Sequence, residues 1–147
     1  MQNEFMLLAI EEAKKANVSG EVPVGAVLVL DGKAVAKCHN LVETKGLSTA
    51  HAEMLAINEA SEKLGVRSLS GASLYVTLEP CPMCAGAIIN SRISSVYFGA
   101  YDPVMGAFGG KFDISQEGIS PNLKVYGGIC EEECSSLLTE FFKNLRA

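Results

Sequence analysis

The chain lacks a long apolar run and a basic leader. No stretch approaches the roughly 20 consecutive apolar residues of a membrane-spanning helix, so we expect no membrane partner. The first residues, MQNEFMLLAIEEAKKA, place acidic side chains within the apolar stretch and have no basic segment before it. That pattern is not typical of a secretory signal peptide. These absences predict a cytoplasmic enzyme.

Positive charge is also scarce. The chain has 12 Lys and Arg against 17 Asp and Glu, a formal net charge of −5 and a pI near 5.0. Nonspecific attraction to nucleic acid depends on clustered Lys and Arg that neutralise phosphates. The composition therefore argues against a broad nucleic-acid surface and against DNA as a partner, but it leaves room for a local site that handles one nucleotide.

Histidine is rare, with two in the chain, and the five cysteines are an odd number. Two of the cysteines form the segment Cys81-Pro-Met-Cys84. Without a secretory signal, this usage favours reduced thiols or metal ligands over a disulfide framework. The 147 residues, 48% of them hydrophobic, fit one globular domain over residues 1–147. We see no internal repeat or interdomain linker.

Apolar periodicity predicts helices that alternate with strands. Asp31-Gly32 is a strong hairpin signal, Thr49 and Gly65 are expected to bracket the second helix, and Pro82 should open the third. The expected helices are 4–16, 50–64, 82–90 and 130–145, and the expected strands are 24–30, 33–39, 73–78, 95–100 and 123–127. This order predicts an α/β domain whose helices cover a mixed sheet. The long Gly-rich loop before the last strand is expected to be functional or mobile.

The final predicted helix carries apolar residues at a spacing typical of a core-facing helix. They are Cys134, Leu137, Leu138, Phe141, Phe142 and Leu145. The three cysteines outside the Cys81–Cys84 segment are expected to act as small buried hydrophobic residues. They are Cys38, Cys130 and Cys134.

His51, Cys81 and Cys84 together offer one imidazole and two potential thiolates. Three protein ligands leave a tetrahedral zinc ion with an open position for water, which distinguishes a catalytic site from a structural one. Cys81 would lie at the start of a helix, where the helix dipole favours a thiolate, and Cys84 follows about one turn later. Taken alone, the Cys-x-x-Cys pair is equally compatible with a redox pair or half of a zinc knuckle.

Glu53 lies two residues after His51, at the start of the same predicted helix. A carboxylate there can take a proton from a metal-activated water and pass it to a substrate nitrogen. Taken alone, an acidic residue in a first helical turn commonly does no more than interact favourably with the helix dipole. The combination H-x-E followed by P-C-x-x-C is more specific, because it matches the established signature of zinc-dependent base deaminases.

Segments along nearly the whole chain resemble the bacterial tRNA-specific adenosine deaminases, in the same order. They are EVPVGAVLV, TAHAEMLAI, LYVTLEPCPMCAGAIINSRI, VYFGAYDP with GAFGG, and ECSSLLTEFF. The resemblance implies a cytidine-deaminase-like, three-layer α/β/α fold with a central five-stranded mixed sheet, usually in a homodimer. It also implies a hydrolase with one zinc ion per chain that converts adenosine to inosine at the wobble position of a tRNA anticodon stem-loop.

Residue roles follow from the same resemblance. His51, Cys81 and Cys84 would bind zinc, and Glu53 would be the general acid and base that protonates N1 of the flipped-out adenine as ammonia leaves C6. Three further residues would contact the substrate: Asn40 the purine ring, Asp102 the ribose next to the target base, and Phe142 the RNA-binding groove. Each of these residues also has a purely structural alternative. Asn40 could be a turn residue, Asp102 could form a turn pair with Pro103, and Phe142 could be a core residue.

The chain departs from the family around the expected RNA contacts. Tyr101, Val104 and Met105 stand in a loop that is often basic in the family, and LSTAHAE replaces the commoner DPTAHAE. These differences keep a second enzymatic hypothesis open, the deamination of a free purine base such as guanine, or of a nucleoside. A non-enzymatic, zinc-stabilised binding subunit is a third hypothesis, although structural zinc normally takes four protein ligands and needs no Glu53.

Overall fold

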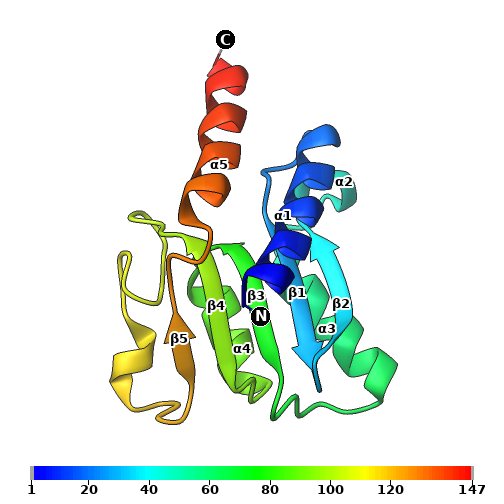
Figure 1. Cartoon of the computed structure of the whole chain (residues 1–147), viewed down its shortest axis with the longest axis vertical. Coiled ribbons are helices and arrows are strands. Elements are labelled where there is room, and N and C mark those ends of the chain that lie inside the picture. The colour runs from blue at the N-terminus through cyan, green and yellow to red at the C-terminus, as the bar shows by residue number, and fades with distance from the viewer. Residues whose placement is uncertain (1, 147) are drawn as a thin grey trace.

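A five-stranded mixed sheet forms the centre of the protein in the computed structural model, which describes residues 2–146 (Figure 1). The strands lie in the order β2-β1-β3-β4-β5. β1 is antiparallel to both β2 and β3, whereas β3, β4 and β5 are parallel to one another. Their bounds are β1 Gly25–Leu30, β2 Lys33–His39, β3 Ser73–Leu78, β4 Ser95–Ala100 and β5 Lys124–Tyr126.

Helices cover both faces of the sheet, which confirms the predicted three-layer arrangement. In Figure 1, α1 lies in front of the sheet, α3 and α4 lie behind it, and α5 rises beyond the end of β4. The first half of α5 packs on the α1 side, since Cys134 belongs to the cluster that contains Met6 and Ile10. The helices are α1 Gln2–Val18, α2 Val42–Lys45, α3 Ala52–Leu64, α4 Pro82–Asn90 and α5 Glu131–Arg146, with a short 3-10 helix η1 at Ile114–Glu117. Among residues 2–146, no helix has both the length and the apolar character to span a membrane.

Alternation along the central strands divides the core into two layers. Leu28 of β1 and Leu74 of β3 pack in the cluster beneath α3 and α4. The intervening Val27 and Val29 pack with Tyr75 in the cluster beneath α1. Because successive side chains of a strand point to opposite faces, one run of apolar residues serves both layers. This explains why these strands read as continuous apolar segments.

The predicted hairpin and the start of α4 are confirmed. Asp31 and Gly32 both have positive φ, 53° and 74°, as a two-residue type I′ turn requires, and Pro82 is the first residue of α4. The predicted start of α3 is wrong, because His51 rather than Thr49 is the N-cap. The side chain of Asn40 determines this start, since its Oδ1 accepts the backbone N–H of Ala52 at 2.9 Å.

The core-facing pattern predicted for the last helix holds only in its first half. Cys134 is 1% exposed, but Phe142 and Leu145 are 41% and 70% exposed. Figure 1 shows the reason. The C-terminal half of α5 extends past the ends of the strands, so it has no sheet surface to pack against. Of the other two cysteines expected to be buried, Cys38 and Cys130 are only half-buried.

Candidate metal centre and active site

Two helix starts bring His51, Cys81 and Cys84 together. His51 is the N-cap of α3, and Cys81 is the N-cap of α4. The Nδ1 atom of His51 lies 3.7 Å from Sγ of Cys81 and 3.5 Å from Sγ of Cys84. Pro82, at the first position of α4, ends the extended chain that follows β3 and turns Cys84 back toward Cys81. The sequence pattern therefore predicted side chains that do converge in the fold.

The separations within this triad fit a zinc ion. Tetrahedral zinc with Zn–N of about 2.0 Å and Zn–S of about 2.3 Å places its ligand atoms roughly 3.5–3.8 Å apart. The three potential ligand atoms of the triad all lie within 4.8 Å of one another, and no other such group of His, Cys, Asp or Glu occurs among residues 2–146. One nitrogen and two sulfur ligands suit zinc better than magnesium or calcium.

The surrounding groups favour a thiolate at the triad. Hydrogen bonding with Cys84 and then with His51 lowers the pKa of Cys81 to about 4, against the opposing effect of burial. The hydrogen bond with Cys81 in turn raises the pKa of His51. The pKa of Cys84 is raised by its hydrogen bond with Cys81 and by burial. A bound cation would favour the second thiolate, because metal coordination deprotonates a thiol.

Glu53 follows His51 by two residues and is 4% exposed. Burial raises the pKa of its carboxyl to about 7, with the nearby His51 opposing the shift. A group with a pKa near the working pH can both accept and donate a proton. Its position in the first turn of α3 places it beside the triad, where the sequence analysis expected a proton carrier.

A cavity of about 520 Å³ opens onto this group of residues. His51, Glu53 and Cys81 line it, and so do the predicted substrate contacts Asn40 and Asp102. Phe142 does not line it. The remaining lining residues are Glu21, Val22, Val24, Val42, Glu43, Leu78, Glu79 and Met105.

Asn40 and Asp102 are both held by backbone contacts. The Nδ2 of Asn40 donates to the Val22 carbonyl at 3.2 Å, while its Oδ1 accepts from Ala52 at the start of α3. Asp102 folds its own loop, because its Oδ1 accepts the N–H groups of Val104 and Met105 at 2.9 and 3.2 Å. Asn40 therefore fixes the chain after β2 against the start of α3, and Asp102 shapes its own loop where that loop lines the cavity.

Two buried carboxylates in the cavity wall were not singled out by the sequence analysis. Glu21 is 1% exposed and Glu79 is 2% exposed. Glu21 accepts hydrogen bonds from the N–H groups of Glu43 and Thr44 and from the Thr44 hydroxyl, and thereby holds α2 at the cavity. Both residues stand in segments that carry the family resemblance, EVPVG and LEPCP. Their hydrogen-bond partners follow more than 20 residues later, so spacing along the chain gave no signal.

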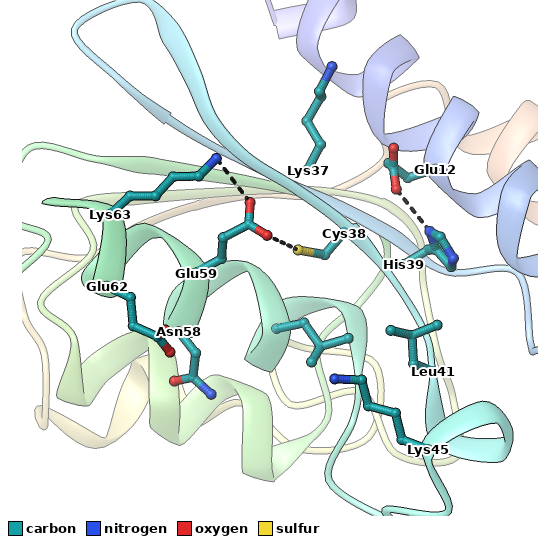
Figure 2. A pocket seen from close by; sticks show the side chains of 11 residues that line it. Glu12, Lys37, Cys38, His39, Leu41, Lys45, Asn58, Glu59, Glu62 and Lys63 are labelled. Carbon is teal, nitrogen blue, oxygen red and sulfur yellow. Dashed lines mark hydrogen bonds and ion pairs between the residues drawn. The ribbon is translucent and has the colours of Figure 1, made fainter.

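A second cavity, of about 570 Å³, lies beside β2, between α1 and α3 (Figure 2). Figure 2 shows His39 directed at Glu12, and Cys38 and Lys63 both directed at Glu59. Burial and the nearby Glu59 raise the pKa of Cys38 to about 12, so this thiol is not poised to react. Within residues 2–146, the lining of the second cavity also contains no group of three potential metal ligands.

Known proteins resemble this chain in both sequence and structure. The model of the cytidine and deoxycytidylate deaminase zinc-binding region matches residues 1–100. The tRNA-specific adenosine deaminase of Bacillus subtilis (strain 168) is 53% identical over 143 residues, covering 97% of this chain and 89% of that protein.

Solved structures extend the likeness to the fold. One comes from a study of A-to-I editing by tRNA:A34 deaminases at the wobble position of transfer RNA, with a TM-score of 0.88, 46% identity and coverage of 92% of this chain and 99% of that one. The guanine deaminase from Nitrosomonas europaea has a TM-score of 0.83 at 25% identity, covering 95% of this chain and 83% of that one. The chain belongs to the zinc-binding cytidine and deoxycytidylate deaminase family, among the tRNA-specific adenosine deaminases.

Proposed function

We propose that this protein deaminates adenosine to inosine at the wobble position of a tRNA anticodon, and that it does so in the cytoplasm. The observation that carries the proposal is the buried Glu53 beside the triad of His51, Cys81 and Cys84, at the base of an open cavity. The two tRNA adenosine deaminase relatives named above favour adenosine in tRNA over other substrates of the family, since they are 53% and 46% identical to this chain.

His51, Cys81 and Cys84 would hold the zinc ion in this mechanism. When bound, zinc lowers the pKa of water and so supplies the nucleophile for attack on C6 of adenine. Glu53 accepts the proton that the attacking water loses and delivers it to N1 of the purine, and a second transfer to the amino group allows ammonia to leave. The raised pKa of Glu53 suits this shuttle, because neither its acid nor its base form is strongly disfavoured near neutral pH.

The cavity wall would hold the flipped-out nucleotide. We assign Asn40 to the purine ring and Asp102 to the adjacent ribose, since both line the cavity. Met105 lines the cavity and is 47% exposed, and Tyr101 and Val104 of the same loop are 49% and 70% exposed. Unpaired bases of a loop can stack on exposed aromatic side chains, and Tyr101 and Phe142 are the candidates that we assign to this contact.

The decisive assay compares purified protein on an anticodon stem-loop with an adenosine at the wobble position, on free adenosine and on free guanine. The proposal expects inosine in the stem-loop, with little turnover of the free compounds at equal concentration. A matched stem-loop in which the wobble adenosine is replaced by guanosine controls for other deaminated positions. Turnover of guanine alone would reject the proposal.

The second candidate function is the deamination of a free purine, and one observation favours it. The cavity is lined by five acidic residues and by no Lys or Arg among residues 2–146, which gives phosphates near its mouth little attraction. The fold is also shared with the guanine deaminase described above. The same substrate comparison separates the two candidates, because a free-purine deaminase would leave the stem-loop unchanged.

We also propose that the chain works as a homodimer, with α4 at the interface. Met83 and Ala87 of α4 are only partly buried by the rest of the chain, whereas Ile88 is fully buried within it and faces the core. The exposed Phe112 lies beside Pro82 along the same surface. Light scattering at assay concentration should give twice the chain mass, and an active monomer would reject this proposal.

A further inference from the structure

Glu79 occupies the short connection between β3 and α4, one residue after Leu78 and two before Cys81. Its backbone N–H donates to the carbonyl of Ala100, which keeps the connection parallel to the end of β4. Its side chain is 2% exposed and lines the catalytic cavity. The role of a buried carboxylate depends on the groups that compensate for its lost hydration.

Three backbone N–H groups of one loop converge on the Glu79 carboxylate. Its Oε1 accepts from Asp102 at 2.9 Å, and its Oε2 accepts from Phe108 at 2.9 Å and from Gly110 at 2.8 Å. No Lys, Arg or His within residues 2–146 forms an ion pair with it. The loop backbone therefore provides all the observed compensation, and a carboxylate that accepts two or three backbone N–H bonds is well satisfied.

The loop is also fitted sterically around this carboxylate. A Cβ atom added at Gly106 would come within 2.3 Å of the Cδ atom of Glu79. At Gly110 the added atom would lie 2.3 Å from Oε1 of Glu79 and 2.3 Å from the carbonyl oxygen of Asp102. Two glycines of the GAFGG segment are thus required by close approach to a single side chain.

Building on the proposed function, we propose that Glu79 is a positioning residue that holds Asp102 and its loop at the cavity mouth, and so determines how the ribose beside the target adenosine is bound. Within the protein, Asp102 uses its N–H, its Oδ1 and its carbonyl oxygen, which accepts the N–H of Gly106 at 2.9 Å. Its Oδ2 has no hydrogen-bond partner among residues 2–146. The free oxygen is the one available to a ribose hydroxyl. Glu79 acts through Asp102 and does not itself touch the reacting atoms.

Glu79→Gln tests this role with a minimal change of shape. The amide keeps one acceptor oxygen, which can retain the pair of N–H donors from Phe108 and Gly110, but its NH₂ group would then face the N–H of Asp102. Two donors cannot bond to each other, so the contact to Asp102 is the one expected to be lost. Glu12→Gln is the matched control, because Glu12 is also buried but lines the second cavity rather than the catalytic one.

The first measurement is backbone amide hydrogen exchange, which needs no substrate. Glu79→Gln should raise the exchange rate of the Asp102 amide by about tenfold or more, the effect expected when a hydrogen bond to a charged group is lost. Gly110→Ala, which crowds the same carboxylate, should raise exchange across the same loop. Glu12→Gln should leave the exchange of that loop unchanged. Wild-type exchange in both loop variants would overturn the proposal.

The second measurement is steady-state deamination of an anticodon stem-loop. Glu79→Gln should raise KM by about tenfold and change kcat by less than about threefold, because ground-state positioning is weakened while the metal triad is intact. Zinc content should stay at one per chain. A kcat that falls as much as kcat/KM, with KM unchanged, would overturn the proposal by showing that Glu79 acts on the chemical step.

A 2′-deoxy substitution in the nucleotides flanking the target adenosine completes the test. The wild-type enzyme should lose affinity for the 2′-deoxy stem-loop, and Glu79→Gln should lose much less, because the contact is already weakened. Equal losses in both enzymes would reject the link between Glu79 and the ribose. Failure of the wild-type enzyme to deaminate any stem-loop would reject the proposed function instead, and amide exchange would still decide whether Glu79 positions the loop.

Discussion

Glu53 is the residue on which proton transfer depends. Glu53→Gln removes the titratable group at nearly constant volume, so we expect kcat to fall by at least roughly 10²-fold and up to about 10⁴-fold. Zinc content and thermal stability should be retained, since none of the three triad residues is altered. Single-turnover deamination together with metal analysis measures both effects. A variant with near wild-type turnover would remove Glu53 from the mechanism.

Cys84 is the buried member of the metal triad. Cys84→Ala should abolish stoichiometric zinc binding, because two remaining ligands do not complete the three-ligand site of a catalytic zinc. Cys38→Ala is the matched control, as this thiol is half-buried and lies in the second cavity. Metal analysis of both purified proteins tests the assignment. Full zinc content in Cys84→Ala would show that the ligand set is wrong.

The triad could be predicted from sequence because its residues stand at helix starts with a recognisable spacing. The two buried glutamates of the cavity wall could not. Glu79 accepts hydrogen bonds from residues 23 to 31 positions away, and Glu21 accepts from residues 22 and 23 positions away. Every residue except proline has a backbone N–H group, so the sequence does not reveal which of them a carboxylate binds. A glutamate that binds loop backbone therefore cannot be distinguished in the sequence from an ordinary surface glutamate.

Helix α1 is joined to the edge strand β2 by a single buried carboxylate (Figure 2). Glu12 is 6% exposed, and it bonds Nδ1 of His39 at 2.9 Å and Nζ of Lys15 at 2.8 Å. Burial opposes ionisation of Glu12, but the hydrogen bonds from His39 and Lys15 outweigh it and lower its pKa below 4.5. These hydrogen bonds therefore favour the charged form of the Glu12 carboxylate in the folded state.

A pH dependence of stability follows from that lowered pKa. The contribution of Glu12 is fully present above its unfolded value of 4.5 and is lost as the pH falls through the folded value. Glu12→Gln should be less stable than wild type at about pH 7, and the difference should narrow toward about pH 3. Urea denaturation at both values measures it. Glu11→Gln, at a more exposed neighbour paired with Lys14, should change little at either pH, and an equal effect there would contradict the prediction.

Elements were predictable where one short-range signal decides the conformation. The hairpin at Asp31-Gly32 and the helix at Pro82 belong to this class. The start of α3 does not belong to this class. Its first N–H, that of Ala52, is satisfied by the side chain of Asn40, which lies 12 residues earlier in the chain. The short helix α2 was missed for a similar reason, since the side chain of Glu21 holds it in place. The exposed end of α5 depends on where the sheet ends, which local periodicity does not encode.

The charges of the whole molecule are arranged unfavourably for phosphate binding near the catalytic cavity. The cavity lining contains Glu21, Glu43, Glu53, Glu79 and Asp102 and no Lys or Arg among residues 2–146. Met105 lines the cavity, and Tyr101 and Val104 of the same loop are exposed. Stacking of a base on an aromatic side chain such as Tyr101 contributes roughly 1–3 kcal/mol and, in contrast to phosphate neutralisation, releases no counterions. Shape and stacking should therefore dominate recognition of an anticodon loop.

A shallow salt dependence of RNA binding is the measurable consequence. If Lys111, Lys143 and Arg146 are the phosphate contacts, then three contacts at roughly 0.7 each give a slope of about −2 in log Kobs against log salt. Anisotropy of a labelled stem-loop with the Glu53→Gln protein measures the slope without turnover. Lys111→Ala should reduce its magnitude by about 0.7, while Lys33→Ala, at the far end of β2 from Asn40, should leave it unchanged. A slope that implies six or more contacts would show that basic residues scattered in sequence converge on the RNA, and phosphate charge would then be the main source of affinity.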